Sequence, residues 1–82
     1  MSKLDKEINR IPLLVAVELA SRAHDEAIKN PDLRYGQALF NLVTSYHPNL
    51  ATFYTGTGAD FFYEQSSVAV NSMFYKYWVS EE

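Results

Sequence analysis

The sequence predicts an all-α fold: a compact bundle of about four helices, two longer, one short and one aromatic helix at the C-terminal end. Prolines and glycines divide the chain into segments of helical length. Apolar residues recur at helical spacing within these segments. The 82 residues include no cysteine, which excludes a disulfide framework. We expect a flexible N-terminal lead-in at residues 1–10 and a single helical domain over residues 11–82.

The first helix is expected from Pro12 to Lys29. Proline fits the first helical turn, where its missing N–H would have no partner, and Asn9 is a candidate cap. The pair Asn30-Pro31 ends the helix, because proline disfavours helical geometry in the residue before it. The predicted apolar stripe consists of Leu13, Ala16, Val17, Ala20, Ala23, Ala27 and Ile28.

A second helix is expected after Asp32, which is a suitable N-cap. Gly36 lies inside this helix and lowers its propensity, which predicts close packing against a neighbouring backbone. The predicted apolar stripe consists of Leu33, Gly36, Leu39, Phe40 and Val43.

Pro48 begins a short third helix, Asn49 to Thr55, and Gly56 is expected to end it in the left-handed conformation. A tight loop from Thr57 to Asp60 should follow, because its residues are turn formers.

Residues 66–79 are compatible with two structures. Apolar and polar positions partly alternate, which permits a strand. We favour a helix capped by Ser66 or Ser67, because of the segment's length and because a lone strand would have no partner within the chain. The apolar positions of that helix would be Val68, Met73, Tyr75, Trp78 and Val79.

Charge is distributed unevenly along the chain. Between Tyr35 and Tyr75 the charged residues are Asp60 and Glu64, whereas the first 34 residues carry six charges of each sign. A charge-poor surface is cheap to desolvate, which indicates contact with another protein. Nucleic acid is not an expected partner, because the net charge is −3 and acids lie among the N-terminal basic residues. Those basic residues are Lys3, Lys6, Arg10, Arg22 and Lys29.

Nine of the twelve aromatic residues lie between Phe53 and Trp78. Two interpretations are open: these rings form the core, or an exposed subset forms a contact surface. The predicted partner-binding residues are Tyr54, Phe61, Phe62, Tyr63, Tyr75 and Trp78. We therefore expect a non-enzymatic protein-interaction module that binds a protein partner or self-associates as a homo-oligomer.

No catalytic, metal or cofactor site is expected. His24 and Asp25 are adjacent on a helix and point in different directions, and His47 is distant in sequence. The run Thr55-Gly56-Thr57-Gly58 follows a helix and has no nearby lysine, unlike a phosphate-binding loop. The absence of cysteine fits the cytoplasm, and the apolar run from Ile11 to Val17 is too short to span a membrane.

The segment from Arg34 to Tyr63 carries a further pattern. Its elements are Arg34-Tyr35-Gly36-Gln37, Asn41, Pro48-Asn49-Leu50-Ala51, Gly56-Thr57 and Asp60-Phe61-Phe62-Tyr63. This pattern resembles small uncharacterised proteins of bacteria and their phages that share R-x-G-Q-x-x-x-N, P-x-L-A and G-T-x-x-D-x-F-Y blocks. Those proteins often carry proline directly after the aspartate, where this chain has Phe61. The resemblance covers about thirty positions and implies a compact helical domain, a bacterial or phage setting and no assigned activity.

The polar residues of this segment suggest two roles. In the first, the amides of Gln37 and Asn41 hydrogen-bond the backbone of the glycine loop, and Arg34 pairs with Asp60. In the second, a polar groove near that loop binds a nucleotide or metabolite through Arg34, Gln37, Asn41 and Asp60, with Tyr63 at its edge. The structural role is favoured, because joining a helix to a loop is the commoner use of buried amides.

Overall fold

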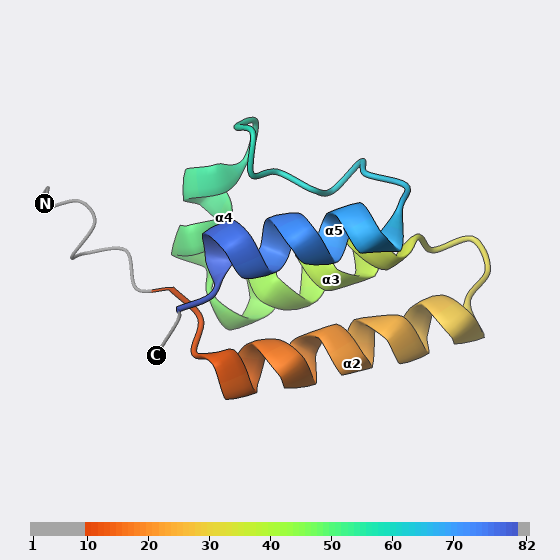
Figure 1. Cartoon of the computed structure of the whole chain (residues 1–82). Coiled ribbons are helices and arrows are strands. Elements are labelled where there is room, and N and C mark those ends of the chain that lie inside the picture. Colours follow the sequence, from red (N-terminus) through yellow and green to blue (C-terminus); the bar gives the residue numbers. More distant parts are fainter. Residues whose placement is uncertain (1–9, 81–82) are drawn as a thin grey trace, which may run out of the picture.

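A computed structural model describes residues 10–80 as a bundle of four α-helices and a C-terminal π-helix (Figure 1). The elements are α2 (Leu13–Lys29), α3 (Tyr35–Tyr46), α4 (Pro48–Tyr54), α5 (Ser67–Met73) and η1 (Phe74–Trp78). The predicted all-α class is confirmed. Apart from Arg10, the expected lead-in, which includes Asn9, lies outside the described residues. Helix α2 has Pro12 in its N-cap position, so the expectation that Asn9 caps this helix is wrong.

Helix α3 is the centre of the bundle. Helix α2 packs along one side of α3, and α5 with η1 packs along another, while α4 turns back at the end of α3 (Figure 1). The long segment between α4 and α5 runs over the outside of the bundle before it enters α5. Residues from α4, this segment and η1 are thereby collected at one end of the molecule.

Helix α2 faces α3 with small side chains. Ala16, Leu19 and Ala23 are buried, and alanines let the two helices approach closely. Three residues of the predicted stripe, Leu13, Val17 and Ile28, are instead exposed, so that part of the prediction is wrong. The predicted stripe covered too wide an arc, since a helix packed mainly on one neighbour buries only the positions close to the centre of its inner face.

The turn between α2 and α3 is longer than predicted. Helix α2 ends at Lys29 as expected, with Asn30 as its C-cap, but α3 begins at Tyr35 with Arg34 in the N-cap position. The expected cap Asp32 is therefore wrong. Asn30 explains the delay, because its carbonyl accepts the Leu33 N–H and its side-chain oxygen accepts the Asp32 N–H.

Gly36 lies where α3 meets the segment before α5. A Cβ atom at this position would lie 2.8 Å from the Phe61 carbonyl oxygen and 3.0 Å from Cγ2 of Val70. Such distances leave no space for a methyl group. The predicted close approach of a neighbouring backbone to Gly36 is confirmed.

Helix α4 follows the predicted boundaries closely. It begins at Pro48, ends at Tyr54 and is followed by Gly56 at φ +80°. This backbone conformation is one that residues with a Cβ adopt at a cost. The predicted left-handed terminator is confirmed.

The C-terminal segment is helical, and the Ser66 hydroxyl oxygen caps it by accepting the Ala69 N–H at 3.3 Å. Val70, Phe74 and Trp78 form its buried face, four residues apart. Residues four apart lie on the same face of a helix, so these three side chains point together into the core. Val68, which was expected on the buried face, is exposed.

Trp78 is the centre of an aromatic core. Its side chain is fully buried, and its ring centroid lies 4.8 Å from that of Tyr54, 5.1 Å from Phe61 and 5.6 Å from Phe40. These separations are typical of favourable ring contacts. Rings from α3, α4, the following loop and η1 therefore meet at one point.

The two ends of the described chain are joined by backbone hydrogen bonds. The Ile11 N–H donates to the Trp78 carbonyl at 2.9 Å, and the Ser80 N–H donates to the Ile11 carbonyl at 2.8 Å. These bonds accompany an isolated parallel bridge between Ile11 and Val79. The bridge places Arg10 beside η1.

Candidate functional site

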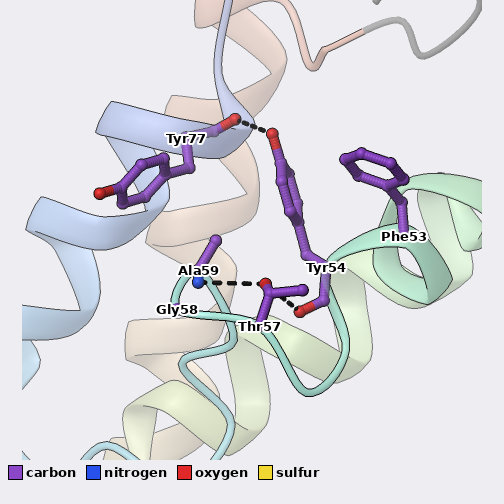
Figure 2. A pocket seen from close by; sticks show the side chains of 6 residues that line it. All are labelled: Phe53, Tyr54, Thr57, Gly58, Ala59 and Tyr77. Carbon is purple, nitrogen blue, oxygen red and sulfur yellow. Dashed lines mark hydrogen bonds between the residues drawn. The ribbon is translucent and has the colours of Figure 1, made fainter. Parts of the chain in front are cut away.

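An open pocket lies where α4, the loop after it and η1 meet (Figure 2). Its volume is about 420 Å³, within the range of sites that hold small ligands or single side chains. Three of its six lining residues are aromatic. The lining consists of Phe53, Tyr54, Thr57, Gly58, Ala59 and Tyr77.

Tyr54 forms the inner wall of the pocket. Its ring packs on Trp78, and its hydroxyl donates to the Tyr77 carbonyl at 2.6 Å (Figure 2). One end of this side chain is thus held by the aromatic core and the other by η1. The wall is fixed before any partner arrives, which lowers the entropic cost of binding.

The loop wall is held by Thr57. Its hydroxyl donates to the Tyr54 carbonyl at 2.6 Å and accepts the Ala59 N–H at 3.2 Å (Figure 2). Its own backbone N–H also donates to the Tyr54 carbonyl. The carbonyl of Ala59 accepts the indole N–H of Trp78 at 2.9 Å, so the loop is tied to both α4 and η1.

Asp60 completes the loop. One carboxylate oxygen accepts the Gly56 N–H at 2.8 Å and the other accepts the Phe62 N–H at 3.1 Å. Asp60 thus hydrogen-bonds the backbone of the loop, a role that was predicted for the side-chain amides of Gln37 and Asn41. That prediction is wrong, because Thr57 and Asp60 satisfy the loop locally and the two amides are not among its partners.

The outer walls of the pocket are Phe53 and Tyr77. Phe53 is 42% exposed and Tyr77 is 37% exposed, so both rings offer apolar surface to the solvent. Gly58 leaves its side of the pocket open, since a Cβ there would meet no atom within 4 Å. An apolar group of a partner can reach the inner wall without displacing any of these residues.

Two cations lie beside Tyr77. The Lys76 ammonium is 5.2 Å from the centroid of the Tyr77 ring, a cation–π distance. The Arg10 Nε donates to the Tyr77 carbonyl at 3.0 Å. Both side chains are exposed. The edge of the pocket at η1 is therefore positive, although the pocket itself is apolar.

The structure divides the predicted partner-binding residues into two groups. Tyr54, Phe61 and Trp78 belong to the core, and the prediction is wrong for Phe61 and Trp78, which are fully buried. The edge-on and tilted contacts of neighbouring rings with Trp78 explain their burial. Tyr54 nevertheless reaches the pocket with one face of its ring.

The other predicted contact residues remain at the surface, away from the pocket lining. Tyr63 is 78% exposed, while Phe62 and Tyr75 are half-buried. The ring of Phe62 contacts Phe40 edge-on at 5.5 Å between centroids. Their contribution to a contact surface stays a prediction.

Phe53 and Tyr77 were not among the predicted contact residues. Phe53 directly precedes Tyr54, and Tyr77 directly precedes Trp78; Tyr54 and Trp78 were both predicted contact residues. Successive residues of a helix point about 100° apart, so an aromatic beside a core aromatic faces outward. The adjacent pairs Phe53-Tyr54 and Tyr77-Trp78 therefore carried a signal that identifies one inner and one outer ring in each pair.

The predicted ligand-binding set does not form one groove. Among the described residues, Arg34 and Asp60 make no ion pair with each other, so that expected pair is wrong. Both instead contact Phe62: its carbonyl lies 3.5 Å from Arg34 Nη2, and its N–H donates to Asp60. The buried Arg34 Nε has no hydrogen-bond partner there. Gln37 is half-buried and Asn41 is exposed, and none of the four lines the pocket.

Tyr35 forms a separate polar contact between α3 and α5. Its hydroxyl donates to Oδ1 of Asn71 at 2.5 Å. Burial, followed by the nearby Tyr75, raises the pKa of Tyr35 to about 12. The phenol therefore stays neutral near neutral pH and serves packing.

Neither a metal-binding cluster nor a membrane-spanning helix occurs among the described residues. Over residues 10–80, no group of three or more histidine or acidic residues is placed to hold a metal ion. Within the same range, no helix combines the length and the apolar character that crossing a membrane requires.

The fold and the pocket define a small all-α domain with an open aromatic pocket at one end of its bundle. Comparison of the chain with models of protein families, with curated proteins and with solved structures finds no match. The resemblance of residues 34–63 to bacterial and phage proteins stays a prediction.

Proposed function

We propose that this chain is a non-enzymatic protein-interaction module that holds an apolar side chain of its partner in the pocket between α4 and η1. The observation that carries the proposal is an open apolar pocket of about 420 Å³ whose walls are aromatic. Aromatic side chains dominate the energetics of protein interfaces, and hot spots lie in well-packed pockets that exclude water.

The rigidity of the pocket supports this proposal. Tyr54 and Ala59 are both held by hydrogen bonds to or from η1. A partner side chain that enters such a pocket loses its own freedom but does not have to order the walls. Binding energy from the buried apolar surface is therefore retained.

The low charge around the pocket also supports it. Between Tyr35 and Tyr75 the charged residues are Asp60 and Glu64, and both carboxylate oxygens of Asp60 already accept backbone N–H groups. Within residues 35–75, few charged groups would therefore have to be desolvated when a partner covers the pocket.

Selection from a displayed library of random twelve-residue peptides tests the proposed function. The wild-type chain should enrich sequences that share an aromatic or large aliphatic residue. A Phe53→Ser, Tyr77→Ser double variant should lose this enrichment, whereas Tyr63→Ser should keep it, because Tyr63 does not line the pocket. Equal enrichment by the wild type and the double variant would contradict the proposal.

Binding of a small ligand is the second candidate function. The pocket lies beside the Gly56–Gly58 loop, although none of the residues of the predicted polar groove lines it, and its volume suits a small molecule. Its lining favours an aromatic or apolar metabolite over a phosphate, since none of the six residues is charged. A thermal-shift screen tests this function, because a ligand specific for the native state raises Tm.

The proposal also covers the oligomeric state, the cellular location and the biological role of the chain. We propose self-association, supported by Leu14 at 85% exposure and by the exposed Ile28 on the outer face of α2. Light scattering over a wide concentration range measures it. A cytoplasmic location rests on the absence of cysteine. A role as a phage or mobile-element accessory protein that docks on a host component rests on the sequence resemblance.

A further inference from the structure

Building on the proposed function, we infer that the partner of this pocket is a peptide segment that carries an acidic residue next to its aromatic or large aliphatic anchor. The apolar pocket selects the anchor. The cations on its edge, Lys76 and Arg10, select the neighbouring carboxylate.

The position of Lys76 supports this inference. Its ammonium lies 5.2 Å from the centroid of the Tyr77 ring, and Tyr77 lines the pocket. An anchor that packs on Tyr77 therefore brings its flanking residues within reach of a flexible, exposed lysine. The cation–π contact is weak at an exposed site, so the ammonium remains free to pair with a carboxylate.

Arg10 supplies a second cation, at the backbone carbonyl of Tyr77. Its Nε is occupied by the Tyr77 carbonyl, which fixes the guanidinium against η1. The two remaining guanidinium nitrogens make no hydrogen bond to another described residue and offer the paired donors that match a carboxylate. Nε thus anchors Arg10 to the Tyr77 carbonyl, and the two Nη atoms can donate to a carboxylate of the partner.

Asp60, the acidic residue nearest in sequence to the pocket lining, does not pair with the cations beside Tyr77. Both oxygens of Asp60 accept backbone N–H groups inside the loop, and Glu64 follows four residues later outside the lining. The described residues thus place cations, and not carboxylates, beside Tyr77. Complementary charge on a partner raises the association rate and fixes the orientation of the anchor.

Three blocked tripeptides test this inference by NMR titration: acetyl-Asp-Trp-Asp-amide, acetyl-Asn-Trp-Asn-amide and acetyl-Lys-Trp-Lys-amide. All should shift the amide signals of Gly58 and Ala59. At low ionic strength the acidic peptide should bind about three- to tenfold more tightly than the neutral one, because exposed ion pairs are individually weak. The basic peptide should bind most weakly, and 0.5 M salt should reduce the differences.

A charge reversal provides the matched control. Lys76→Glu should remove the preference for the acidic peptide over the neutral one, measured as the ratio of their affinities within the same variant. Equal affinities of the wild type for all three peptides, with shifts at Gly58 and Ala59, would overturn the inference and leave the proposed function standing. An absence of shifts at Gly58 and Ala59 with every peptide would overturn both.

Discussion

The indole N–H of Trp78 donates to the carbonyl of Ala59 at 2.9 Å, inside the aromatic core. This bond joins η1 to the loop after α4, and Ala59 is also part of the pocket lining. The same residue that centres the core therefore positions one wall of the pocket. The hydrogen bond between Trp78 and Ala59 therefore contributes both to the stability of the fold and to the shape of the pocket.

Replacement of Trp78 by phenylalanine should destabilise the chain by about 1–3 kcal/mol, because the buried Ala59 carbonyl loses its donor, with a further cost for the space left by the smaller ring. Urea unfolding followed by circular dichroism measures the loss. Tyr54→Phe serves as the comparison: it should cost only about 0.5–1.5 kcal/mol, since Arg10 continues to donate to the Tyr77 carbonyl. A larger loss in Tyr54→Phe than in Trp78→Phe would contradict this account.

Gly36→Ala should destabilise the chain even though alanine favours helix. The added methyl group would lie 2.8 Å from the Phe61 carbonyl oxygen, a backbone atom that cannot rotate away. Overpacking of this kind costs about 1–3 kcal/mol, against a gain in helix propensity of about 1 kcal/mol. The midpoint of urea unfolding should therefore fall.

Gly58→Ala is the matched control for Gly36→Ala. Its Cβ would meet no atom within 4 Å, and its φ is not positive. Its stability should stay within about 0.5 kcal/mol of wild type. Equal effects of the two substitutions would show that Gly36 is not a close-packing site.

Phe61→Ser and Tyr63→Ser should separate core from surface within one short segment. Phe61 is fully buried, and truncation of a buried aromatic residue costs about 3–5 kcal/mol, a large part of a small domain's stability. Tyr63 is largely exposed, so its replacement should leave the circular-dichroism spectrum and Tm nearly unchanged. Retention of the native spectrum and Tm by Phe61→Ser would place its ring outside the core.

Stability should decrease in strongly alkaline solution through Tyr35. Its pKa in the folded chain is about 12, above the ordinary value of 10.0, so the folded state holds this proton more tightly than the unfolded state. The stabilising contribution is complete below pH 10 and is lost as the pH rises from 10 through 12. Tyr35→Phe should make this loss smaller, as measured by urea unfolding at several pH values. An unchanged pH profile in Tyr35→Phe would contradict the assignment.

The sequence predicted the helices where local chemistry dominates. Pro48 and Gly56 set the ends of α4, Ser66 caps α5, and Gly36 marks a close approach, all as observed. Each of these effects depends on one residue and its backbone conformation. Such effects can be recognised without knowledge of the neighbouring elements.

Features that depend on distant neighbours were not predicted. The inner face of α2 is set by the position of α3, and the passage into a π-helix at Phe74 has no local marker in the sequence. The pocket itself forms only when Tyr77 folds back onto Tyr54, 23 residues away. The outer rings of the pocket, Phe53 and Tyr77, can be identified from the sequence only when the adjacent Tyr54 and Trp78 are known to lie in the core.

The most direct test of the central claim is the set of intermolecular nuclear Overhauser effects between the chain and acetyl-Asp-Trp-Asp-amide. The pocket predicts contacts from the indole ring of the peptide to the Ala59 methyl group and to the rings of Phe53 and Tyr77. Contacts to the exposed methyl groups of Leu14, Val17 or Ile28 on α2, without any to Ala59, would contradict the account. The contact surface would then lie on the outer face of α2.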